Sequence, residues 1–126
     1  MKKPRLLIPL FGLFLAALPA LAHHSITAEF DPAKQFTVTG VLTRLEWANP
    51  HSYWYVDVKD ENGQVVTWRF QGHGPGRYHR AGVRKEDWKI GEVVTVTGLA
   101  AKDGTQHLGF GLEIKYADGH ALIFDH

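Results

Sequence analysis

The chain has 126 residues, with 14 lysine and arginine against 13 aspartate and glutamate residues, and it contains no cysteine. The lack of cysteine excludes disulfide bonds, thiolate metal sites, a cysteine nucleophile and a lipidated cysteine. Without a marked basic excess the chain is a poor candidate for binding nucleic acid, which needs a basic surface opposite the phosphates. Its length suits one small domain with a single core.

The first 22 residues have the order of a secretory signal peptide. A basic start, MKKPR, precedes the apolar run LLIPLFGLFLAALPALA, in which Ala20 and Ala22 supply the small residues before a cleavage point. The run is short and contains prolines, whereas a membrane span needs about 20 apolar residues. We therefore expect cleavage after residue 22 rather than an uncleaved anchor. The remaining 104 residues carry 11 basic and 13 acidic side chains, which predicts a mildly acidic periplasmic protein with no stable membrane anchor.

The mature chain is predicted to be all-β with one helical interruption. A polar leader over residues 23–35 ends at Asp31-Pro32, and the folded domain spans residues 36–126. Alternation of apolar and polar residues predicts strands within residues 36–48, 52–60, 64–70, 92–104, 108–119 and 121–124. Gly40 lies where the apolar parity of the first strand changes, which suggests a bulge or bend.

The connector over residues 71–91 is rich in glycine and shows no strand alternation, so we expect short helices around residues 77–81 and 85–88. Three strands, a helical connector and further strands is the order of an OB-type barrel. The sequence thus predicts a small OB-like β-barrel with a short helical connector between strands 3 and 4. A generic β-sandwich or another barrel is the alternative. The predicted core residues are Trp54, Trp68, Val94, Val96, Phe110, Leu112 and Ile114.

Four segments form a recognisable combination: AHHS at 22–25, EFD at 29–31, the stretch from Val38 to His51, and the stretch from Lys89 to Lys102 with VTVTG at its centre. This combination resembles a family of small exported proteobacterial proteins known only as a domain of unknown function. The resemblance implies an OB-like β-barrel in the periplasm. It brings no activity and no catalytic residue, so function has to be argued from the residues themselves.

Eight histidines in so short a chain suggest a metal site. Cleavage of the leader makes His23 the first residue, and its free amine and ring nitrogen together form a chelate for a divalent ion. In an OB-like barrel the loops that hold His51 and His107 flank one binding face. A nitrogen-rich, tetragonal donor set suits Cu(II) and resembles the histidine-brace sites of exported copper proteins. We therefore expect copper bound by His23, His51 and His107, with His24 as a further donor.

Two other readings stay open. The side chains of Tyr53, Tyr55 and Arg69 are predicted on the face opposite Trp54, where they suit a small ligand or an exported protein partner. His51 alternatively caps backbone groups of its Asn-Pro-His turn. The sequence has no nucleophile elbow, phosphate-binding loop or zincin helix, so binding is expected more than catalysis. A copper enzyme that activates oxygen is a third reading.

Overall fold

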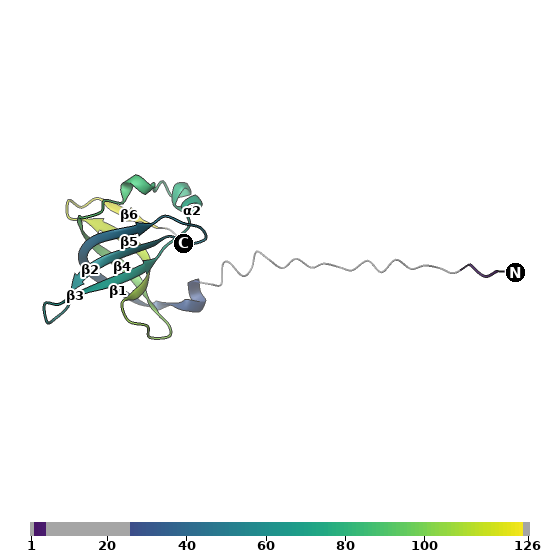
Figure 1. Cartoon of the computed structure of the whole chain (residues 1–126), viewed down its shortest axis with the longest axis horizontal. Helices are drawn as coiled ribbons and strands as arrows, with labels where there is room; N and C mark the ends of the chain where they lie inside the picture. The colour runs from purple at the N-terminus through teal and green to yellow at the C-terminus, as the bar shows by residue number, and fades with distance from the viewer. Residues whose placement is uncertain (1, 5–25, 125–126) are drawn as a thin grey trace.

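The computed structural model describes residues 2–4 and 26–124, and its domain is a six-stranded, mostly antiparallel β-sheet (Figure 1). One helical turn over residues 26–29 precedes the first strand. The elements that follow are β1 (Phe30–Glu46), β2 (Tyr53–Lys59), β3 (Val65–Gln71), α2 (Pro75–Arg80), the 3₁₀ turn η1 (Lys85–Asp87), β4 (Val93–Ala101), β5 (Leu108–Tyr116) and β6 (Ala121–Ile123). The predicted all-β class is confirmed, and the helical connector lies between β3 and β4.

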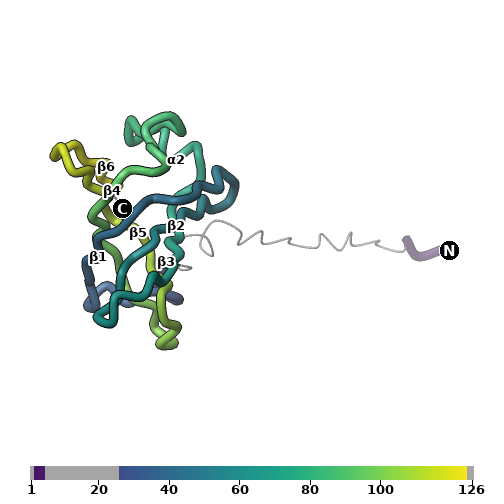
Figure 2. The backbone as a smooth tube through the Cα atoms, turned by 60° about the vertical axis from the view of Figure 1, so that its left-hand side comes forward, coloured from purple at the N-terminus to yellow at the C-terminus, as the bar shows by residue number. Residues whose placement is uncertain are grey.

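The strands are hydrogen-bonded in the order β3-β2-β1-β4-β5-β6, and β3 also pairs in parallel with β5. The parallel pairing joins Arg69–Gln71 of β3 to Leu108–Phe110 of β5. The pairings among β1, β2, β3, β5 and β4 therefore form a closed cycle, and β6 is attached to β5 outside it. Figure 2 shows α2 at the upper end of the molecule, whereas the loop between β4 and β5 projects from the lower end.

The first strand begins at Phe30, earlier than the start at residue 36 that the sequence predicts. Phe30 and Asp31 pair with Ala101 and Ala100 of β4, and the register then shifts so that Gln35 faces Leu99. Pro32 lies in this irregular stretch. Proline has no backbone N–H to donate, and the regular ladder requires none at this position. The Asp31-Pro32 pair, which looked like the end of a leader, is thus part of β1.

The change of apolar parity in β1 comes after Leu42, not at Gly40. Leu42 is fully buried, whereas Val41 is 37% exposed, and the register of β1 on β2 shifts between Leu42 and Arg44. Gly40 has another role, because a Cβ there would lie 2.1 Å from the carbonyl oxygen of Asp57. A residue without a side chain allows the two strands to come this close.

An aromatic core is centred on Trp54 of β2. The centroid of its ring system lies 4.6 Å from Phe70, 5.2 Å from Trp88 and 6.3 Å from Phe124. Four further aliphatic side chains that surround these rings, from β2, β4 and β5, are at most 1% exposed: Val56, Val94, Val96 and Ile114. Burial of the predicted core residues Trp54, Val94, Val96, Phe110 and Ile114 is confirmed.

Two predicted core residues, Trp68 and Leu112, are only half-buried. They pack against the buried clusters and do not lie fully inside them. Trp68 packs against the edge of the aromatic core. Leu112 belongs with a second cluster made by Phe30, Leu99 and Phe110. The register of β4 on β5 shifts between Thr97 and Gly98, and Gly111 faces Trp54. Because side chains alternate along a strand, Phe110 and Leu112 on either side of Gly111 point away from Trp54 and toward the second cluster.

The connector between β3 and β4 is fixed to the core by two tyrosines. The hydroxyl of Tyr116 donates to the carbonyl oxygen of Asp87 at 2.7 Å and accepts the N–H of Lys89 at 3.0 Å. Tyr78 of α2 is 1% exposed, and burial, which disfavours the charged phenolate, raises its pKa to about 12. The side chain of Tyr78 is therefore neutral at physiological pH, as its packing against aromatic rings requires.

Candidate functional site

A groove of about 850 Å³ is bounded by the start of the domain, the segment between β1 and β2, and α2. This volume falls in the range of roughly 300–1,000 Å³ that is typical of small-molecule sites. Its apolar lining residues are Ile26, Pro32, Pro50, Leu99 and Leu112. Two imidazole side chains, of His51 and His73, and two guanidinium side chains, of Arg77 and Arg80, also line it. The groove thus combines aliphatic surface with nitrogen-bearing side chains.

Backbone pairing brings the segments of His51 and His73 together. The N–H of Ser52 donates to the carbonyl oxygen of His73 at 3.1 Å, and the N–H of Gly72 donates to that of Ser52 at 2.8 Å. At the next glycine, Gly74, a Cβ would lie 2.7 Å from Oδ1 of Asn49. The glycine-rich segment therefore approaches the segment of His51 closely. This places both histidines in the lining of one groove.

Nδ1 of His51 is buried and has no hydrogen-bond partner among the described residues. A buried polar atom without a partner costs about 1–3 kcal/mol, so a ligand that satisfies this nitrogen gains that energy. Nδ1 therefore caps no backbone group among the described residues. Among the predicted metal ligands that the structure describes, His51 is the one that lines the groove.

His73 also lines the groove, although the sequence did not favour a ligand role for it. It is 5% exposed, and its ring packs edge-on against Phe110 and Tyr78 with centroid distances of 5.2 and 5.7 Å. Its segment, GHGPG, reads as an ordinary turn. The available signal was the pair of glycines on either side of His73, because glycine is the residue that permits close approach of two backbones.

His107 lies apart from this groove. Its φ is 56° and its ring packs edge-on against Trp68 at 5.3 Å. The β4–β5 loop that leads to His107 projects from the end of the molecule away from α2 in both views (Figures 1 and 2). His23 and His24 lie outside the described residues. Within residues 2–4 and 26–124, no three histidine, cysteine, aspartate or glutamate side chains are grouped to hold a metal ion.

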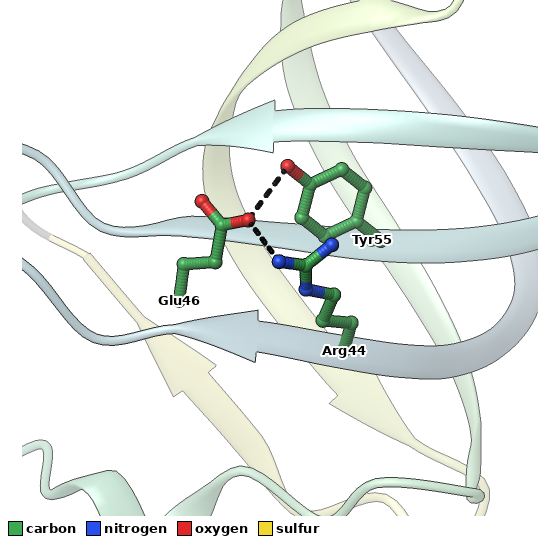
Figure 3. Close-up of polar contacts among 3 residues, drawn as sticks. All are labelled: Arg44, Glu46 and Tyr55. Atoms are coloured by element: carbon green, nitrogen blue, oxygen red, sulfur yellow. Dashed lines mark hydrogen bonds and ion pairs between the residues drawn. The ribbon is translucent and has the colours of Figure 1, made fainter.

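The predicted aromatic face is assembled on the outside of β2 and β3. The guanidinium carbon of Arg69 lies 3.9 Å from the ring centroid of Tyr53, a cation–π contact. The hydroxyl of Tyr55 donates to Glu46 at 3.2 Å, and the same carboxylate oxygen forms an ion pair with Arg44 at 2.8 Å (Figure 3). The structure thus places all three predicted ligand-binding residues on adjacent strands, and neighbouring polar groups hold their side chains.

A smaller hollow of about 390 Å³ adjoins this face. Tyr53 and Arg69 line it together with Gln71 and Leu108, and its other charged lining residues are Glu29, Lys102 and Asp103. Tyr55 is not part of its lining. The aromatic face and the histidine groove are therefore two distinct candidate sites, with different residues and different chemistry.

No helix in the described part of the chain is long and apolar enough to cross a membrane. No curated protein and no solved structure matches the chain. Comparison with protein families gives a match to "Family of unknown function (DUF6152)" over residues 12–113. The matched region includes both histidines of the groove and the whole aromatic face. The chain therefore belongs to the DUF6152 family of unknown function.

Proposed function

We propose that this protein is an exported binding protein of the periplasm, released from its leader by cleavage after residue 22. The basic, apolar and small-residue order of the leader supports this. We further propose that the closed cycle of strand pairings forms an OB-like barrel. Its support is the order β1–β2–β3–β5–β4 together with the helical connector between β3 and β4.

The proposed ligand is Cu(II), held in the groove by His51 and by the amine and ring of His23. The observation that carries this is the buried, unpartnered Nδ1 of His51 in a groove whose lining includes Ile26. Ile26 is three residues after His23, and three residues span at most about 11 Å. A mature chain that starts at His23 is therefore long enough to bring its first residue to the groove.

His73 shares the groove with His51, so it takes the place that the sequence gave to His107 as the additional imidazole. His24 is the donor next to His23 in the chain. A set of amine and imidazole nitrogens suits Cu(II), which also has the highest affinity among the divalent first-row ions. These nitrogens bind metal only without their protons, so the affinity for Cu(II) falls on acidification.

Replacing His51 with alanine in the mature chain is expected to weaken Cu(II) binding by about 10–100-fold or more. Even the loss of a group that only supports a metal ligand costs about 10–100-fold, and His51 is proposed as a ligand itself. His107→Ala is the matched control, because the ring of His107 packs on Trp68 outside the groove. Titration against a competing chelator measures both variants. Unchanged binding in His51→Ala, or an equal loss in His107→Ala, would contradict the proposal.

The aromatic face supports a second candidate function, the docking of a small planar ligand or an exported protein partner. The specific observation is the guanidinium of Arg69 above the ring of Tyr53, at the edge of a hollow that both residues line. Stacked rings and oriented guanidinium groups bind aromatic, sugar or peptide surfaces. This function does not involve His23, so a change at the N-terminus of the mature chain distinguishes it from the copper function.

A further inference from the structure

The hollow of about 390 Å³ beside the aromatic face has charged groups on two sides of β5. On one side, Arg69 of β3 pairs in register with Leu108 of β5. On the other side, β4 pairs with β5, and its end leads to Lys102 and Asp103 in the loop that projects from the lower end of Figure 2. Glu29 lies beside them, because its carbonyl oxygen accepts the N–H of Lys102 at 2.8 Å. The first side therefore has one cation, and the second has one cation and two carboxylates.

The charged side chains of the hollow are not paired with one another. Among the described residues, Arg69, Lys102 and Glu29 form no ion pair. The carboxylate of Asp103 accepts the N–H and the hydroxyl of Thr105 at 2.9 and 2.6 Å. These hydrogen bonds hold the pKa of Asp103 below its usual range, so the side chain is an anion at neutral pH. The hollow thus keeps opposite charges apart on its two sides.

The side formed by β2 and β3 suits a carboxylate. The guanidinium carbon of Arg69 lies 3.9 Å from the ring centroid of Tyr53, and a guanidinium group binds a planar carboxylate through two parallel hydrogen bonds. Gln71 is 6% exposed, and its Oε1 accepts the hydroxyl of Tyr53 at 3.5 Å. The amide nitrogen of Gln71 has no acceptor among the described residues, so it is available as a further donor. On the other side two carboxylates outnumber one ammonium group, which favours a cation.

We propose that this hollow binds a small zwitterion, with its carboxylate at Arg69 and its ammonium group at Asp103 and Glu29. Free amino acids and short peptides have this chemistry. A ligand with a single charge would satisfy only one side of the hollow, and the volume of about 390 Å³ lies at the lower end of the range for small-molecule sites. The proposal rests on the second candidate function, in which the aromatic face binds a ligand, and it names the class of that ligand.

The test uses leucine and dileucine as probes, each with two analogues that keep one charge. The C-terminal amide lacks the carboxylate, and the N-acetyl form lacks the ammonium group. The mature protein is kept metal-free, because amino acids themselves chelate Cu(II). We expect one of the two zwitterions to bind at least about tenfold more tightly than its own analogues, since each analogue loses hydrogen bonds between charged groups. Calorimetry gives the affinities, methyl chemical shifts of Leu108 locate the ligand, and the tighter probe distinguishes an amino acid from a peptide.

Arg69→Gln is expected to weaken binding of the zwitterion by about tenfold and to leave binding of the amide analogue unchanged, because the amide has no carboxylate to lose. Arg44→Gln is the matched control, since Arg44 also lies over a tyrosine ring, that of Tyr55 at 5.3 Å, but outside the hollow. Asp103→Asn is expected to weaken binding of the zwitterion and to leave binding of the N-acetyl analogue unchanged.

Equal losses in Arg69→Gln and Arg44→Gln would show a general charge effect and overturn the proposal. Equal affinities for the zwitterion and its analogues, or no binding of either zwitterion, would also overturn it. Indole, a neutral planar probe, tests the aromatic face separately. Binding of indole at Tyr53 by a protein that binds no zwitterion would overturn the present proposal and leave the second candidate function standing, whereas failure of both kinds of probe would count against both.

Discussion

Replacing Trp54 with alanine is expected to lower the free energy of unfolding by about 3–5 kcal/mol. Trp54 is fully buried, and its ring contacts Phe70, Trp88 and Phe124. Its removal loses these contacts and leaves a cavity that the surrounding rings fill only in part. A small domain has a total stability of about 5–15 kcal/mol, so this variant is close to unfolding. Urea denaturation followed by circular dichroism measures the difference.

Val65→Ala is the control for Trp54→Ala. Val65 is 60% exposed at the start of β3, and substitutions at such surface positions change stability by about 0.5 kcal/mol or less. If Trp54→Ala shifted the urea midpoint no more than Val65→Ala, the aromatic core described for this domain would be wrong.

Replacing Gly111 with alanine is expected to destabilise the domain by about 1–3 kcal/mol through overpacking. A Cβ at this position would lie 2.1 Å from Cζ2 of Trp54, so the strand or the indole ring has to move. Gly76→Ala is the matched control, because the nearest atom to its Cβ is Nη1 of Arg80 at 3.7 Å, an ordinary contact. Alanine is also favoured over glycine within a helix such as α2 by up to about 1 kcal/mol.

The two large effects are expected to be coupled, since they involve the same contact. In a protein that already has Trp54→Ala, the atom that clashes with the new methyl group is absent, so Gly111→Ala should cost much less. Contacting residues show coupling energies of about 0.5–3 kcal/mol in double-mutant cycles. Strictly additive losses would mean that Gly111 does not face the ring of Trp54.

The elements that could be predicted from sequence are those governed by local patterns. β2 and β3 alternate between apolar and polar residues and are joined by a turn in which Gly63 has a φ of 75°, so both strands and the side of the sheet on which Tyr53 lies followed from the pattern. The early start of β1 could not be predicted in this way. Phe30 and Asp31 are held by pairing with β4, a partner distant in sequence, and this overrides the tendency of Asp-Pro to end a strand.

In the candidate site, too, local patterns indicate some residues, whereas long-range contacts position others. His51 was identifiable because it follows a strand end in a histidine-rich chain, whereas the glycines beside its companion in the groove, His73, indicated an ordinary turn as well as a close approach. His73 reaches the groove through backbone bonds between its segment and Ser52, which no periodicity in either segment indicates. The loops of His51 and His107 were expected to flank one binding face, on the order of strands and loops in an OB-type barrel alone. The loop of His107 instead leaves the domain on the side away from α2 (Figure 2).

The central claim is that the first residue of the mature chain binds Cu(II) together with His51. The most direct measurement compares the mature protein with a form that carries one additional glycine before His23. The addition keeps every side chain but separates the free amine from the ring with which it forms a chelate. We expect the affinity for Cu(II) to fall by orders of magnitude while the thermal unfolding of the metal-free protein stays the same. Equal copper affinity in the two forms would contradict the N-terminal site and favour the aromatic face as the functional surface.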